Sequence, residues 1–242
     1  MQNIVSLKSK DWLVINGSQN SNNYGLYVDT PPKKPMAAQN YRQINIPDRE
    51  ESLYIKEEKF EDMTLNIKGY TFSNEYDPSD LYAWLRTAKT ISFNSDTAHC
   101  YRVKKVNGVI PNYSGHGKNV YTLSFVVSPF VYYTSNNAVT DTHKNFIVNN
   151  PGNYYSRPVY KIYGSGNINL AVSSDAYPTS PDMTVMNVNE YCIIDAERTL
   201  VYKDGELLKW SGKIPLLDVG DNAVFLEGST TKCEIIVNAR DC

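Results

Sequence analysis

The residues that could do chemistry in this 242-residue sequence are its histidines, its cysteines and one run of acids. His99, His116 and His143 form neither an HxH nor an HExxH arrangement, so a metal site would need ligands gathered from distant loops. Cys100 follows His99 directly, but neighbouring residues of a strand point to opposite faces, so adjacency alone does not make a nucleophile and its base. We expect these residues to be structural or exposed.

Other signatures of catalysis and cofactor binding are missing from the sequence. It has no GxSxG motif of a serine hydrolase and no Walker loop, and its four cysteines form no CxxC pair. The pattern predicts no catalytic residue, no cofactor, no metal and no enzyme activity. Free thiols are expected at Cys100, Cys192, Cys233 and Cys242.

The acids are densest in DREESLYIKEEKFED, residues 48–62, which hold seven acids and three bases. A glycosidase needs two carboxylates roughly 5 to 10 Å apart in a cleft. Here the acids come as Glu-Glu pairs around the apolar residues Leu53, Tyr54 and Ile55, a pattern that protects an exposed strand edge from sticking. We interpret the run as a solvated strand or hairpin edge.

The composition favours a protein that presents surfaces. The formal net charge is −2, so no global basic field argues for nucleic-acid binding. The 19 tyrosines are typical of protein interfaces, where the ring is buried and the hydroxyl remains in contact with water. The first residues lack the pattern of a secretory signal, and no apolar stretch reaches about 18 residues, so we expect a soluble protein made in a cytoplasm without membrane insertion.

Strand-like runs alternate with turn clusters up to about residue 130, and one helix stands out in YDPSDLYAWLRTAKT. Asp77 can cap this helix, and Pro78 suits its first position. Trp84 has apolar neighbours at helical spacing, so we assign it to the core rather than to a sugar platform. The apolar face consists of Leu81, Trp84, Leu85 and Ala88.

The segment of residues 129–153 is rich in Ser, Thr and Asn with turn signals at both ends, so we place a domain boundary within it. The expected domains are residues 1–135 and 136–242. Beyond the boundary, short strand-like runs at regular spacing predict an antiparallel β-sandwich. In RPVYKIYGSGNINLAV, residues 157–172, the Gly-Ser-Gly between two aliphatic runs predicts a tight hairpin turn.

The order of these features resembles the siphophage distal tail proteins, usually called Dit, which are hub components of the tail tip. The N-terminal resemblance rests on INIPDREESLYI, KFEDMTLNIKGYTF, the helix DLYAWL, the strand TISFNSD and YRVKKV. The C-terminal resemblance rests on NYYSRPVYKIYGSGNINLAV and on EYCIIDAERTLVYKDGELLKWSGKIPLLDVGDNAVFL. These segments cover most of the chain. One departure lies in PDREES, where relatives usually have a glycine.

This resemblance implies a mainly β fold, with an N-terminal β-structured ring domain that has one α-helix and a C-terminal galectin-like antiparallel β-sandwich. It implies a homohexameric ring at the distal end of a long non-contractile tail, with a central channel through which DNA passes transiently. The implied partners are the tail tube protein, the tape-measure protein, the tail-associated hub protein and receptor-binding or baseplate proteins. The implied location is the virion tail tip, after assembly in the bacterial host cytoplasm.

Three surfaces are expected to serve such a ring. Residues 41–70 are predicted to form a projecting β arm that pairs with the neighbouring subunit through apolar residues that cannot form a core alone. The loop of residues 107–120 is either a docking loop for the next ring or an ordinary exposed hairpin end. The arm contacts are Tyr41, Ile44, Ile46, Leu53, Tyr54 and Ile55, the loop contacts are Pro111, Asn112, Tyr113 and His116, and the channel-facing acids are Glu57, Glu58 and Glu61.

The alternative function is a carbohydrate-binding β-sandwich that contributes to adhesion at the host cell surface. Its candidate aromatic residues are Trp210, Tyr202, Tyr154 and Tyr155. The loop PLLDVGDN, residues 215–222, fails the spacing of a calcium loop, so we expect Asn222 to support a turn instead.

Overall fold

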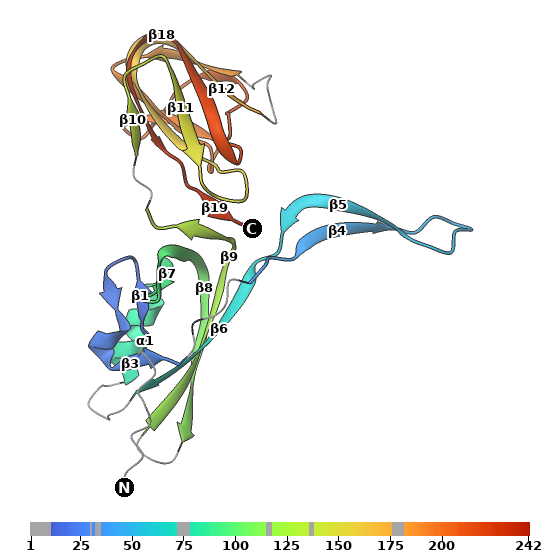
Figure 1. The fold of residues 1–242 in the computed structure, drawn as a ribbon, viewed down its shortest axis with the longest axis vertical. Helices are drawn as coiled ribbons and strands as arrows, with labels where there is room; N and C mark the ends of the chain where they lie inside the picture. The colour runs from blue at the N-terminus through green and yellow to red at the C-terminus, as the bar shows by residue number, and fades with distance from the viewer. Residues whose placement is uncertain are drawn as a thin grey trace. The chain divides into compact units, whose positions relative to one another are not determined.

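A computed structural model of the chain describes residues 11–29, 31, 35–71, 78–114, 118–135, 138–175 and 182–242, without the side chains of Glu58, Pro78, residues 111–114 and Lys118. The chain divides into two compact units (Figure 1). The first holds residues 1–134 together with Cys242, and the second holds residues 135–241. Both units are built from antiparallel strands, with one α-helix in the described residues, so the predicted mainly β class is confirmed.

The core of the first unit lies on one face of an antiparallel sheet. Its strands are β1 (Leu13–Ile15), β2 (Gln19–Asn20), β3 (Leu26–Val28), β6 (Met63–Thr71), β7 (Thr90–Phe93), β8 (Asp96–Ser114) and β9 (Lys118–Tyr133). They follow the order β2-β1-β7-β8-β9-β6-β3. Successive side chains of β6 point to opposite faces of the sheet, so Leu65 and Ile67 are buried in the core while Asn66 and Lys68 are exposed. A short 3-10 helix, η1 (Ser21–Tyr24), precedes β3.

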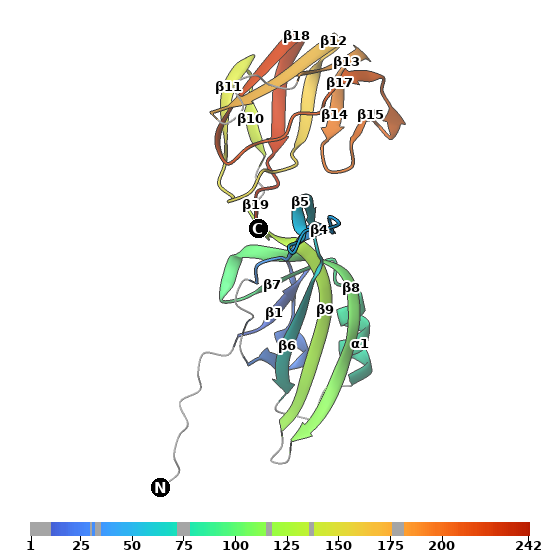
Figure 2. The same cartoon turned by 90° about the vertical axis from the view of Figure 1, so that its right-hand side faces the viewer.

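The helix α1 (Pro78–Arg86) lies against β8 and closes this core (Figure 2). Leu81, Trp84 and Leu85 are buried in it, as their spacing predicts, and the Trp84 ring lies 4.9 Å from that of Tyr24. The expected cap, Asp77, lies outside the described residues. Ala88 falls beyond the end of the helix but packs on the same core.

The sequence prediction of a long loop at residues 107–120 is wrong. The β8–β9 ladder runs from His99 opposite Tyr133 to Ser114 opposite Lys118, with bulges along it, so residues 107–114 continue β8. Three residues, 115–117, lie between the two strands. Gly108 and Pro111 in this stretch favour an interruption of the strand, but β8 stays paired with β9 at both residues.

The second unit is a network of antiparallel strands around two long ones. Two strands, β12 (Val159–Ser174) and β18 (Gly220–Ile236), pair with each other along most of their length. The others are β10 (Val139–Asp141), β11 (Asn145–Asn150), β13 (Asp182–Val188), β14 (Tyr191–Asp195), β15 (Leu200–Lys203), β16 (Glu206–Leu207) and β17 (Trp210–Gly212); β19 (Arg240–Asp241) is not part of this network. The main path is β10-β18-β12-β14-β15-β16, with β11 on β18, β13 on β12 and β17 on β13.

The predicted hairpin turn at Gly164-Ser165-Gly166 is also wrong, because β12 runs straight through it. The three residues form an irregularity at which the register of β12 against β18 shifts. On one side of it β12 pairs with β14, and on the other side it pairs with β13. The glycines therefore allow one strand to serve two sets of partners, which is how strands turn the corner of a sandwich.

Two of these glycines are required for different reasons. A Cβ at Gly164 would clash with the backbone of Ser229 on β18, so close approach of the two strands needs glycine there. Gly166 has open space around it but a φ of +77°, which L side chains rarely adopt. The buried residues Ile162 and Ile168, on either side of this point, are both fully shielded from solvent.

Candidate assembly surfaces

The β arm is a separate two-stranded sheet formed by β4 (Gln39–Ile44) and β5 (Leu53–Phe60). It extends away from the sheet of the first unit (Figure 1). The prediction placed the arm at residues 41–70, and this range needs correction at its C-terminal end. Residues 63–71 form β6, which pairs with β3 and β9 inside the main sheet.

The base of the arm is tied to the first unit by side chains and backbone. The Phe60 ring packs edge-on against that of Phe130 on β9, with centroids 5.4 Å apart. The Glu61 amide donates to the Ala38 carbonyl at 2.9 Å, which links the two chain segments that enter the arm. Together these contacts hold the arm at its root.

The tip of the arm makes its turn without a glycine. Asp48 takes a φ of +64°, a conformation that aspartate tolerates better than most residues. The Ser52 hydroxyl donates to the Asn45 Oδ1 at 2.7 Å and accepts from the Gln43 Nε2 at 2.9 Å. This polar network closes the turn across the two strands.

Strand register gives the arm two chemically different faces. Ile44 lies opposite Leu53 and Gln43 lies opposite Tyr54, and directly opposed residues share a face. The aliphatic face therefore carries Ile44, Leu53 and Ile55 together with Arg42, which lies opposite Ile55, and the tyrosine face carries Tyr41 and Tyr54. Leu53 is 45% exposed and Tyr54 is 62% exposed, so neither face is covered by the described part of the chain.

The other residues predicted for the arm are placed as follows. Ile44 is half-buried, whereas Ile46, just beyond β4, is exposed. Of the acids expected to face a channel, Glu57 is half-buried on β5, Glu61 is exposed at the base, and the Glu58 side chain lies outside the description.

The predicted ring-stacking residues do not form the loop that was expected. Pro111, Asn112 and Tyr113 belong to β8 and lie opposite Tyr121, Val120 and Asn119 of β9. His116 lies outside the described residues.

The candidate chemical residues are dispersed over the described parts of the chain, where no three His, Cys, Asp or Glu side chains gather into a possible metal site. His99 pairs with Asp96 at 2.8 Å, and His143 pairs with Asp141 at 2.7 Å. The four cysteines are free thiols. Burial raises the pKa of Cys233 to about 12, so this thiol stays protonated at neutral pH.

No helix in the described residues is both long and apolar enough to cross a membrane.

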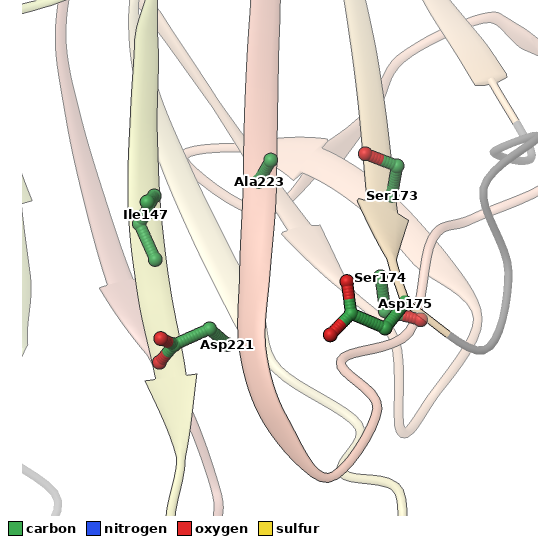
Figure 3. Close-up of a pocket in the computed structure, with 6 residues that line it drawn as sticks. All are labelled: Ile147, Ser173, Ser174, Asp175, Asp221 and Ala223. Carbon is green, nitrogen blue, oxygen red and sulfur yellow. The ribbon is translucent and has the colours of Figure 1, made fainter.

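The second unit has an open pocket of about 400 Å³ on the strands β11, β12 and β18 (Figure 3). Its lining holds no aromatic residue and consists of Ile147, Ser173, Ser174, Asp175, Asp221 and Ala223.

The four aromatic candidates for sugar binding do not gather in one site. The centroids of the Tyr154 and Tyr155 rings lie 4.4 Å apart with the rings tilted by 34°, and the Arg240 guanidinium lies 5.4 and 5.0 Å from the two centroids. Tyr202 lies on β15 and Trp210 on β17, strands that belong to different branches of the sheet. None of the four lines the pocket.

The expectation for Asn222 is confirmed. Its side chain is buried, and its Oδ1 accepts from the Asp218 amide at 2.8 Å. Its Nδ2 donates to the carbonyls of Asp218 and Gly220, both at 2.9 Å. Asn222 thus shapes the turn that precedes β18.

Comparison with known proteins points to one fold. No protein-family model matches the chain, and no curated protein matches it. The crystal structure of the Dit protein of phage SPP1 matches with a TM-score of 0.61 and 13% identity, over 92% of this chain and 98% of that one. The chain has a Dit-like fold. The SPP1 protein is described as a paradigm of the hub adsorption apparatus in phages that infect Gram-positive bacteria.

Proposed function

We propose that this chain is a structural, non-enzymatic component of a siphophage tail tip that assembles into a homohexameric ring. The Dit-like fold, which extends over nearly the whole chain, supports a place in a hub adsorption apparatus. In this proposal the ring joins the tail tube and tape-measure proteins to the hub, baseplate or receptor-binding proteins. DNA passes through the central channel, and assembly takes place in the host cytoplasm.

The single observation that carries the proposal is the β arm. An isolated two-stranded hairpin is marginally stable in water, yet this one exposes large apolar side chains on both faces. Five of its six predicted contact residues are exposed in the single chain, namely Tyr41, Ile46, Leu53, Tyr54 and Ile55. Contact with another subunit would cover them, and a contact between one patch and a different patch on the next copy closes into a ring when the rotation between subunits divides the circle.

The far end of the β8–β9 hairpin, with Pro111, Asn112 and Tyr113 on β8, remains our proposal for the contact with an adjacent ring. The open alternative is that this end is an ordinary exposed hairpin. Sugar binding gains no support from the aromatic residues, because the four candidates are separated and the pocket lining lacks an aromatic platform.

The assembly proposal is tested by adding charge to the aliphatic face of the arm. Leu53→Asp with Ile55→Asp should convert the hexamer into monomers, because aspartates cannot be buried against an apolar surface without a large cost. The measurement is native mass spectrometry at one fixed concentration, with circular dichroism to show that the variant is folded.

The matched control is Ile147→Asp with Leu207→Asp, which places the same two charges on aliphatic residues of the second unit that are 66% and 72% exposed. It should leave the hexamer unchanged. A wild-type chain that stays monomeric, or an arm variant that remains hexameric, would overturn the proposed arm contact.

A further inference from the structure

Charge is segregated between two parts of the first unit. The arm and its root, residues 39–62, carry seven acids and four bases. The three long neighbouring strands β6, β9 and β8 carry the single acid Asp96. Their bases are Lys68, Arg102, Lys104, Lys105 and Lys118.

Two of these bases have no ion-pair partner among the described residues. Lys104 is already paired with Asp62, and the Arg102 guanidinium lies 3.7 Å from the centre of the Tyr132 ring. Lys68 and Lys105 are exposed and make no ion pair within the described part of the chain. They are the lysines that a partner could reach.

Lys68 and Lys105 belong to the same exposed face of the sheet, opposite the core. Cross-strand pairing places Lys105 beside Val126, and Lys68 beside Thr122, which in turn lies beside Ile110. Ile110 is 62% exposed, so an apolar side chain lies on the same surface as the two lysines. We call this surface, made of Lys68, Thr122, Ile110, Val126 and Lys105, the basic sheet face.

The arm has the complementary chemistry. Its aliphatic face presents Leu53 and Ile55, with the exposed Arg42 opposite Ile55, and Glu57 follows at the next alternate position of β5. Glu50 and Glu51 are exposed at the tip. The face thus combines apolar side chains with acids toward both ends, and the arm as a whole has more acids than bases despite Arg42, which fits a sheet face that combines an exposed isoleucine with lysines.

We propose that the aliphatic face of the arm docks on the basic sheet face of a second copy of this chain. The proposal rests on the proposed function, since it names the counter-surface of the arm contact. The two surfaces differ, so the contact is heterologous and can close into a ring. It also assigns Glu57 to the neighbour's lysines instead of to the channel.

A second copy fits this face better than DNA does. A phosphate backbone would use the lysines but offers no aliphatic group to cover Ile110 and the partly exposed Val126. The β5 strand of the arm carries both apolar and acidic side chains, and the contact would also remove its exposed apolar residues from solvent.

The test uses two full-length charge reversals. The first, Lys68→Glu with Lys105→Glu, makes the sheet face acidic. The second, Glu50→Lys with Glu51→Lys and Glu57→Lys, makes the arm basic. Each alone should raise the concentration needed for assembly by about tenfold or more, because like charges then meet at the contact.

Mixing the two variants in equal amounts gives the decisive result. The basic arm of one chain meets the acidic sheet face of the other, and the acidic arm meets the basic sheet face, so every contact is complementary again. Native mass spectrometry should show mixed rings in which the two chains alternate. Circular dichroism of each variant alone shows whether it is folded.

The outcomes separate this proposal from the proposed function. If Leu53→Asp with Ile55→Asp abolishes the ring but the sheet reversal does not change it, the arm contact stands and the basic sheet face is the wrong counter-surface. If the mixture fails to assemble although both variants are folded, the docking proposal is also wrong. If the sheet reversal removes only DNA binding, measured by fluorescence anisotropy with a labelled duplex, the face belongs to DNA and the proposal is overturned.

Discussion

Asn222 is a buried polar residue whose hydrogen bonds define a turn in the second unit. Its hydrogen bonds go to backbone groups of the adjoining turn and of β11, so the side chain replaces hydrogen bonds that a regular strand would make. Removal of the side chain leaves the Asp218 amide and the carbonyls of Val148, Asp218 and Gly220 without this partner. The turn and the start of β18 therefore depend on this one amide.

Asn222→Ala should lower the free energy of unfolding by about 2 kcal/mol, because buried polar groups lose their partners. The control is Asn149→Ala, which removes an exposed hydrogen bond to Asp221 and should cost less than about 0.5 kcal/mol. Urea unfolding of both variants measures the two costs. Equal losses would show that the turn does not need the buried amide.

Some single residues could be assigned from the sequence because their role is local. The spacing of Leu81, Trp84 and Leu85 is enough to predict a buried helix face. The pairing of His99 with Asp96 had no comparable signal, since it depends on the tight connection between β7 and β8. Local patterns predict burial more readily than they predict polar partners.

At the scale of elements, the Gly-Ser-Gly of β12 shows why a local signal can have two outcomes. Glycines between aliphatic runs are typical of both a hairpin turn and a bulge. Pairing with β18 selects the bulge over the hairpin turn, and Gly228 of β18 has a φ of +101° beside the same irregularity. That partner strand lies about sixty residues away in the sequence, so the local pattern could not distinguish the alternatives.

Gly164→Ala and Gly166→Ala should therefore differ in cost. Gly164→Ala forces the backbone of Ser229 to move and should lower the free energy of unfolding by about 3 kcal/mol. Gly166→Ala meets no neighbouring atom and should cost about 1 kcal/mol, from its positive φ alone. Thermal or urea unfolding distinguishes them. A larger loss at Gly166 than at Gly164 would contradict this account of the bulge.

The polar segment after residue 129 shows a related limit. Its Ser, Thr and Asn residues favoured a connection, yet β10 and β11 form there by pairing with β18. In β11 alternate residues are buried, as Val148 is, but the exposed positions are mostly asparagines. Tertiary pairing therefore overrides a weak local preference for strands.

For the whole molecule, the arm could be predicted from apolar residues that cannot form a core alone, within a segment whose charge pattern indicates a solvated hairpin edge, but its two faces could not be predicted. The faces depend on the register of β4 against β5, which shifts between Gln39 and Tyr41. The basic sheet face could be predicted from the sequence even less well. Its residues Lys68, Ile110 and Val126 come together only through the order β6-β9-β8.

Both surfaces of the proposed contact lie in the first unit, so assembly should depend on that unit alone. The second unit has a buried centre of its own, with Tyr160, Ile162 and Leu170 fully shielded, and the first has another around Leu123 and Phe125. Residues 135–242, expressed alone, should fold and remain monomeric by multi-angle light scattering. Residues 1–134 should form the same oligomer as the full chain at the same concentration.

The two possible failures of this prediction have different meanings. If the second unit oligomerises by itself, a contact outside the arm and the basic sheet face holds the ring together. If residues 1–134 fold, as judged by circular dichroism, but stay monomeric, the second unit supplies part of the contact. The charge-reversal mixture in the full chain then shows whether the arm still contributes, because alternating rings form only when the arm meets a complementary face.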